Sequence, residues 1–223
     1  MERVPEPQEL MSDVEQAQAY GSADLTRFNG TLIDEFQRHF TDFTGGRVLD
    51  LGCGAADIAI RFARAYPLTT VVGIDGSEAM LELARQGVEG SQLNGRIELR
   101  AGYIPEARLE EDAYDAVVAN SFLHHLSDPS VLWSTISLCA RPGAAVMVVD
   151  LIRPQDAEQA MRLVEEYAGR GRPVVKKDLF NSLCAAYTVD EIEDQLRVAG
   201  MEWMHVEAVS ELQLMVLGFA KAR

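Results

Sequence analysis

The strongest constraint on the fold is a short run at residues 47–57, Arg-Val-Leu-Asp-Leu-Gly-Cys-Gly-Ala-Ala-Asp. An apolar segment ends beside Asp50, Gly52 and Gly54 follow, and apolar residues then recur about once per helical turn. This order predicts a strand, a tight turn and a helix. Because glycine has no Cβ atom, such a turn lets a ligand lie against the main chain and the free N–H groups of the helix start.

Acidic residues in this run separate two classes of ligand. A dinucleotide-binding turn carries a third glycine, which allows close packing around a pyrophosphate. Here that position is Asp57. A carboxylate suits the helix dipole, but it repels a pyrophosphate, and Asp50 adds a second negative charge. The turn therefore favours a ligand that carries a cationic amine.

A second strand, predicted at residues 70–75, also ends in an acid. Asp75 lies 21 residues after Gly54, a position from which a carboxylate can accept the hydroxyl groups of a ribose. The run Val-Leu-Asp-Leu-Gly-Cys-Gly at residues 48–54, together with Asp75, resembles the motifs of class I S-adenosylmethionine-dependent methyltransferases. The resemblance covers about residues 47–220. It implies S-adenosyl-L-methionine as cofactor and S-adenosyl-L-homocysteine as product.

Apolar strand patterns alternate with helical patterns from residue 47 onward, which predicts a parallel sheet with right-handed crossovers. The resemblance implies an α/β, Rossmann-like, seven-stranded, mostly parallel sheet with an antiparallel last strand, helices on both faces and an N-terminal helical cap. Beyond residues 47–51, we expect strands at residues 70–75, 96–101, 114–120, 145–150, 203–209 and 212–220. We expect helices at residues 12–20, 24–40, 78–86, 129–140, 156–167, 176–186 and 188–199. Ser77 should cap the start of the helix at 78–86, and Thr188 with Glu191 forms a capping box that opens the last helix.

We expect one domain over residues 1–223. Its predicted parts are a cap at 1–45, a cofactor-binding core at 46–150, an insert covering the acceptor at 151–187, and a helix with two strands at 188–223. Residues 1–9 read as a loose arm, residues 87–95 as a loop, and Arg-Pro-Gly at 141–143 as the end of a helix.

Ligands of open α/β sheets bind beyond the carboxyl ends of the strands. The glycine turn, Asp75, the residues that follow the third and fourth strands, and Asp150 and Leu151 at the end of the fifth should therefore meet in one crevice. The resemblance places Asp50 near the methionine amine and Asp75 on the ribose. The expected cofactor-binding residues are Asp50, Gly52, Cys53, Gly54, Asp75, Gly76, Met80, Gly102, Tyr103, Ile104, Asn120, Ser121 and Tyr20.

Three of these assignments keep an alternative. Tyr20, with Arg27, either closes over the cofactor or lies on the surface. Met80 packs either on the adenine or in the core. Tyr103 stands where the family commonly has an acid that contacts the adenine, so the main chain or a stacked Tyr103 ring would have to replace that contact.

His124 and His125 follow the fourth strand, next to the expected position of the transferred methyl group. Methyl transfer is an in-line displacement for which the protein supplies orientation and a dry site. An acceptor with a weakly acidic O–H or N–H also needs a base, and a neutral imidazole suits this role. We expect His124 and His125 to be catalytic; the alternative is that one packs and the other is exposed.

The composition and charge of the chain exclude several classes of binding partner. The chain has 48% hydrophobic and 25% charged residues and a formal charge of −15. This acidity disfavours nucleic acid and anionic membranes. Three cysteines without ligand spacing predict neither disulfides nor a metal site, and Cys184 is read as a small buried hydrophobe. We expect a cytoplasmic protein, monomeric or homodimeric, with no membrane or nucleic-acid partner.

The function predicted from the sequence is methyl transfer from S-adenosylmethionine to a small-molecule acceptor. The run after Asn120 lacks the Asn-Pro-Pro-Tyr pattern that accompanies methylation of base or amide nitrogens in this class. Two alternatives stay open. One is an NAD-dependent oxidoreductase on a similar sheet, against which Asp57 argues, and the other is a protein that binds S-adenosylmethionine without catalysis.

Overall fold

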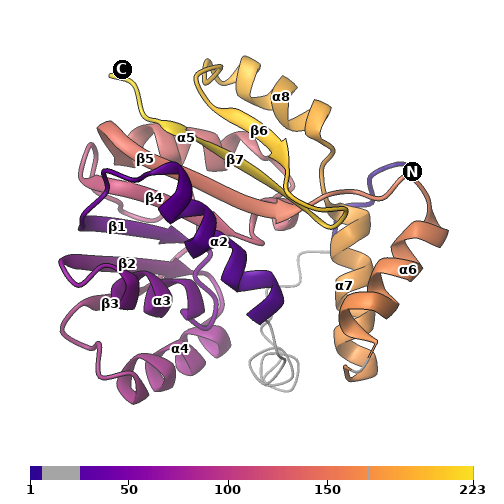
Figure 1. Cartoon of the computed structure of the whole chain (residues 1–223), viewed down its shortest axis with the longest axis horizontal. Coiled ribbons are helices and arrows are strands. Elements are labelled where there is room, and N and C mark those ends of the chain that lie inside the picture. Colours follow the sequence, from indigo (N-terminus) through magenta and orange to yellow (C-terminus); the bar gives the residue numbers. More distant parts are fainter. Residues whose placement is uncertain (7–25, 170, 223) are drawn as a thin grey trace.

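The computed structural model describes residues 1–6, 26–169 and 171–222. Its centre is a seven-stranded sheet with the order β3-β2-β1-β4-β5-β7-β6 (Figure 1). The pairs β1–β2, β2–β3, β1–β4 and β4–β5 are parallel, whereas β7 runs antiparallel to both β5 and β6. This arrangement confirms the predicted fold class. The strands are β1 (Gly46–Leu51), β2 (Thr69–Asp75), β3 (Ile97–Ala101), β4 (Tyr114–Asn120), β5 (Ala140–Leu151), β6 (His205–Ala208) and β7 (Gln213–Phe219).

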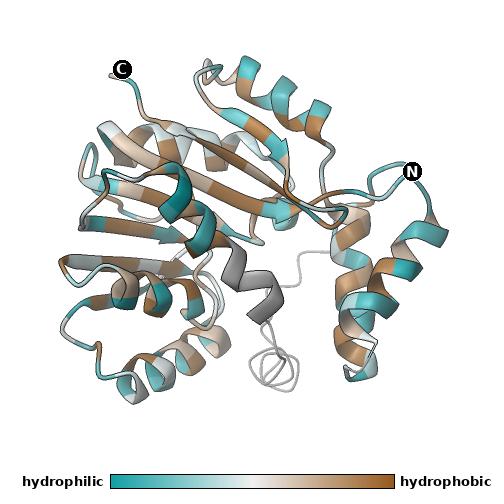
Figure 2. Cartoon of the chain, in the orientation of Figure 1, coloured by the Kyte–Doolittle hydropathy of each residue, from teal (hydrophilic) through white to brown (hydrophobic). Residues whose placement is uncertain are grey.

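Helices cover both faces of the sheet because neighbouring residues of a strand point to opposite faces. Leu49 and Leu51 of β1 pack in one apolar cluster with α5 and α8, whereas Val48 packs in another with α2, α3 and α4. Figure 2 shows apolar residues along the central strands and hydrophilic residues on the outer side of α8. The helices are α2 (Thr26–His39), α3 (Asp57–Ala65), α4 (Glu78–Gly90), the 3₁₀ turn η1 (Leu123–His125), α5 (Ser130–Cys139), α6 (Ala157–Ala168), α7 (Pro173–Ala185) and α8 (Val189–Val198).

Helices α6 and α7 lie side by side beyond the ends of β5 and β7 (Figure 1). A small cluster joins them to the strand ends through Leu151, Leu163, Leu183 and Leu212. Local sequence signals set several helix starts: Asp156 accepts a hydrogen bond from the Gln159 N–H, and the predicted capping box begins α8. None of the described helices has the length and apolar content needed to cross a bilayer.

Three of the predicted features are wrong. Helix α4 continues to Gly90, through part of the predicted loop, and Gly87 within it lies close to α3, since a Cβ atom there would be 3.4 Å from the Ile60 side chain. Strand β5 begins at Ala140, since residues 141–143 continue the strand and Gly143 donates to the Ala220 carbonyl. Residues 1–6 are not a loose arm: Val4 donates to the Cys184 carbonyl at 2.9 Å. The predicted helix at residues 12–20 and Tyr20 lie outside the described residues.

Candidate active site

The glycine turn follows β1, at the point where the strand order reverses. On one side of β1 lies β2, and on the other lies β4. The N–H groups of Gly52 and Cys53 both donate to the Ile74 carbonyl at 2.9 Å, which fastens the turn to β2. Gly52 has φ +70°, and a Cβ atom there would lie 2.3 Å from the Phe122 ring. A side chain at this position would therefore be both strained and blocked, so the turn keeps a bare main chain.

Asp50 is buried at the carboxyl end of β1, with 1% of its surface exposed. Its Oδ2 atom accepts no hydrogen bond. Burial, followed by the negative charge of Asp75, raises the pKa of Asp50 to about 7. An unsatisfied buried carboxylate of this kind is costly unless a partner arrives. The site thus fits a ligand that brings a positively charged amine.

Asp75 closes the other side of the turn at the end of β2. Its Oδ2 accepts from the Gly54 N–H and its Oδ1 from the Ser77 N–H, both at 2.8 Å. Burial raises the pKa of Asp75, against the lowering effect of these N–H donors. The two hydrogen bonds fix the carboxylate and leave lone pairs that can accept ribose hydroxyls.

Tyr103 lies over Gly76, next to Asp75. A Cβ atom at Gly76 would be 2.3 Å from the ring, and half of the Tyr103 surface is exposed. The neighbouring Gly102 donates to the Asp75 carbonyl at 3.0 Å, and Ile104 packs partly against the core. An exposed aromatic ring is thus available beside the ribose acid, at the position where the family commonly has an acid.

The other predicted cofactor residues also lie at these strand ends. Cys53 is buried, and burial and Asp50 keep its pKa well above the ordinary value, so it is a neutral thiol. Met80 is buried with its Cε 3.3 Å from the position of a Cβ on Gly54, so it supports the turn. Asn120 ends β4, and Ser121 takes the left-handed conformation with φ +51°. Such strain in a non-glycine residue is typical of functional sites.

His124 is paired with Asp150, the acid at the carboxyl end of β5. The Nδ1 atom of His124 lies 2.6 Å from Oδ1 of Asp150, and both side chains are buried. Burial opposes a charged imidazole, but the Asp150 carboxylate outweighs it and raises the pKa of His124. Burial likewise opposes the Asp150 charge, yet His124 lowers the pKa of Asp150. The pair is therefore a buried, hydrogen-bonded dyad in which each side chain stabilises the charged form of the other.

Three main-chain groups fix this dyad. The N–H groups of Phe122 and Leu123 donate to Oδ2 of Asp150 at 3.0 and 2.7 Å, and the Leu151 N–H donates to Oδ1 at 2.7 Å. A carboxylate with so many donors stays in one orientation. Because Asp150 engages Nδ1, the Nε2 atom of His124 is left for other chemistry.

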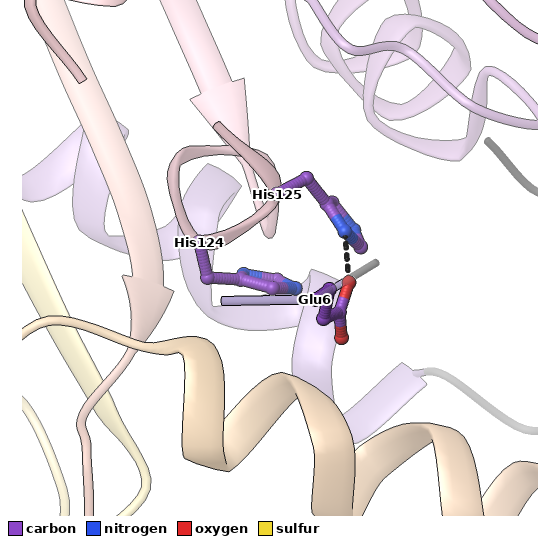
Figure 3. Close-up of side chains that lie close together, drawn as sticks. All are labelled: Glu6, His124 and His125. Carbon is purple, nitrogen blue, oxygen red and sulfur yellow. Dashed lines mark hydrogen bonds and ion pairs between the residues drawn. The ribbon is translucent and has the colours of Figure 1, made fainter. Parts of the chain in front are cut away.

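His125 and Glu6 form a second dyad beside the first. Nδ1 of His125 lies 2.5 Å from Oε2 of Glu6, and the two histidine rings are 4.0 Å apart between centroids. Figure 3 shows the Glu6 side chain beside the end of the His124 ring, with its hydrogen bond to His125 drawn as a dashed line. Arg3 holds this N-terminal segment by donating to the main-chain carbonyls of His124 and Ala185 at 3.2 and 2.6 Å.

Sequence reasoning missed three features of this site, namely the partner of Asp150, the part played by Glu6 and the position of the Phe122 ring. The strand-end position of Asp150 was visible, but its pairing with His124 was not, since 26 residues separate them. Glu6 is 119 residues from His125, and no sequence spacing indicates their contact. Phe122, which covers Gly52, carried no signal beyond its apolar character.

Comparison with known proteins agrees with this geometry. A family model described as a methyltransferase domain matches residues 42–200. The 27-O-demethylrifamycin SV methyltransferase of Amycolatopsis mediterranei is 31% identical over 194 residues, 85% of this chain and 66% of that protein. A ubiquinone/menaquinone biosynthesis C-methyltransferase of Geobacter sulfurreducens is 30% identical over 132 residues, 59% of this chain and 51% of that protein. The alignments thus span about half to two thirds of these relatives.

Solved structures share the fold. A SAM-dependent methyltransferase from Aquifex aeolicus superposes with a TM-score of 0.67 at 18% identity, covering 93% of this chain and 98% of that one. The plantazolicin methyltransferase BpumL, solved with a triazolic desmethylPZN analog and SAH, gives a TM-score of 0.70 at 16% identity, covering 96% and 94%. At these identities the likeness concerns the fold alone.

The sheet order, the bare turn and the acids that end β1 and β2 define a Rossmann-like nucleoside-binding protein. Together with the family match over residues 42–200, they lead to one assignment: the chain belongs to the class I S-adenosylmethionine-dependent methyltransferases. S-adenosylmethionine is accordingly its cofactor. The unsatisfied carboxylate of Asp50 fits the amino group of that molecule.

Proposed function

We propose that the protein transfers the methyl group of S-adenosylmethionine to a small organic acceptor by direct in-line displacement. The cofactor supplies an electrophilic methyl group when bound. Asp50 holds its amine, the turn at Gly52 and Gly54 admits its chain, and Asp75 accepts its ribose hydroxyls. The observation that carries the proposal is the buried His124–Asp150 dyad at the carboxyl ends of β4 and β5, 2.6 Å between Nδ1 and Oδ1.

His124 acts as a general base in this proposal. Asp150 fixes Nδ1 as the bonded nitrogen, so Nε2 is the atom that takes a proton from the acceptor as the new bond forms. The next residue, His125, has a side chain that is one-third exposed, and it contacts the acceptor. Burial of His124 keeps bulk water away from the reacting atoms.

The nature of the acceptor is supported by relatives and by charge. The named relatives are methyltransferases of quinone biosynthesis and of a rifamycin, and BpumL was solved with a desmethylPZN analog. The formal charge of −15 disfavours a polyanionic acceptor. A small molecule with a weakly acidic O–H or N–H, which loses its proton to His124 as the methyl group is transferred, suits the dyad best.

The test uses His124→Asn. The asparagine amide keeps an N–H that can donate to Asp150 but has no basic nitrogen. We expect turnover with phenolic and enolic acceptors, measured as S-adenosylhomocysteine release, to fall about 10²–10⁴-fold, with cofactor affinity nearly unchanged. His205→Asn, an exposed residue on β6, is the matched control.

Two results would overturn parts of the proposal. Full activity of His124→Asn would remove the base, leaving orientation alone. Binding of NAD rather than S-adenosylmethionine in calorimetry would refute methyl transfer, whereas cofactor binding without product release across the acceptor panel would favour a non-catalytic protein.

A further inference from the structure

Among the residues that the structure describes, one group of three has the composition of a metal site. Glu6, His124 and His125 each offer a ligand atom, and these atoms all lie within 4.8 Å of one another (Figure 3). We infer that these three side chains form a binding site for a divalent transition-metal ion of the zinc type. The inference does not depend on methyl transfer, because binding needs neither cofactor nor acceptor. The two roles of Nε2 of His124 exclude each other, so in the zinc-bound protein this atom is not the base proposed above.

The donor atoms select the class of ion. Two imidazole nitrogens and one carboxylate oxygen are a ligand set of zinc sites that keep an open position. Imidazole also suits iron, nickel and copper, whereas magnesium and calcium prefer oxygen ligands. A set with two nitrogens from His124 and His125 therefore favours Zn²⁺ over Mg²⁺.

Supporting hydrogen bonds are already in place for two of the ligands. Metal-binding histidines usually donate their other N–H to a carboxylate, and Nδ1 of His124 is 2.6 Å from Asp150, which directs Nε2 to the ion. Glu6 receives a hydrogen bond from the Ser182 hydroxyl on Oε1 at 2.7 Å. Oε2 is thereby turned to the same point.

The geometry requires only small movements. Ligand atoms about 2.1 Å from one zinc ion lie about 3.4 Å apart. The Glu6–His125 pair, now at 2.5 Å, must open by about 1 Å, and no pair must close by more than about 1.4 Å. His125 is one-third exposed, which leaves an entry path for the ion on its side.

The segment that carries Glu6 is held in position without the ion. Arg3 lies over the Tyr187 ring at 4.0 Å, and its guanidinium donates to the Ala185, His124 and Leu126 carbonyls. These contacts place Glu6 beside the histidines before an ion arrives, so the ion has fewer groups to order.

The experiment measures binding directly, on the full chain without a polyhistidine tag and without cofactor. Metal-free protein is dialysed against Zn²⁺ and bound zinc is counted by mass spectrometry, while Co²⁺ replaces zinc for the visible absorption of a nitrogen- and oxygen-bound site. We expect one ion per chain. His125→Ala and Glu6→Gln should each weaken binding by more than about 100-fold, since the loss of a supporting partner alone costs 10–100-fold.

Two further variants make the test specific. Ser182→Ala removes the partner of Glu6 and should weaken binding about 10-fold. His39→Ala removes a histidine that lies near Glu35 and Glu207 and should leave the affinity for the single bound zinc ion unchanged. Circular dichroism confirms that each variant is folded. Absence of stoichiometric zinc in the unmodified protein, or an unchanged Co²⁺ spectrum in His125→Ala or Glu6→Gln, would overturn the inference.

Discussion

Replacing Asp50 by asparagine should make the cofactor-free protein more stable while weakening its hold on the cofactor. The buried carboxyl group has its pKa raised to about 7 from an ordinary 3.8. Between these two pH values the folded protein keeps a proton that the unfolded chain has released. Stability therefore falls as pH rises through this window and levels off above about pH 7.

The size of the effect follows from that window. One pKa unit corresponds to about 1.4 kcal/mol, so the pH-dependent loss between pH 5.5 and 8 is about 2 kcal/mol. The asparagine side chain carries no charge, so the Asp50→Asn variant lacks this loss. Differences in hydrogen bonding between the amide and the protonated acid are the same at both pH values. The change with pH in the stability difference between the two proteins therefore reports only the charge of Asp50.

Urea denaturation at pH 5.5 and pH 8, without cofactor, measures this difference. The lower pH, 5.5, stays above the isoelectric point of about 4.6. At the isoelectric point the net charge is zero and the protein would tend to associate. Asp57→Asn is the matched control, because Asp57 is half-exposed beside Arg61 in the same turn. Calorimetry at pH 8 should show S-adenosylmethionine bound about 10–150-fold more weakly by the Asp50→Asn variant, the loss of one charged hydrogen bond. An advantage that does not grow with pH would refute the reasoning.

Two other substitutions test the turn. Asp75→Ala should weaken S-adenosylmethionine binding by about 1–3 kcal/mol in calorimetry, whereas Glu82→Ala on exposed surface should not; equal affinities would remove Asp75 from the site. Gly52→Ala should lower the free energy of unfolding by about 1–3 kcal/mol, since its φ is +70° and the new Cβ would meet Phe122. Gly90→Ala, a helical position with open space, should instead stabilise by about 0.5–1 kcal/mol, and a similar sign for both would contradict the argument.

The sequence determined the sheet well because its signals are local. Strand β4 was predicted at its observed bounds, since a continuous apolar run reads the same in the chain and in the core. The capping box of α8 and the cap at Ser77 were also visible, because they join residues three apart. The end of α4 was not, because the glycines that predicted a loop continue the helix instead, and of these Gly87 lies close to Ile60 of α3.

The site was predictable only in part. The glycine turn and Asp75 follow from spacing, and the common strand edge follows from topology. The partners of the two histidines depend on contacts between distant segments, namely Asp150 from β5 and Glu6 from the N-terminal segment. Their positions are set by tertiary packing, which no window of sequence contains.

A single carbonyl oxygen, that of Ile74, accepts hydrogen bonds from the N–H groups of Gly52 and Cys53, in the turn between the two strand-end acids. In the proposed site this contact fixes the distance between Asp50, which binds the amine of the cofactor, and Asp75, which binds its ribose. We expect selectivity for ligand length to follow, such that a cofactor analogue lengthened by one methylene between its sulfur and its amine would satisfy one acid and forfeit the other.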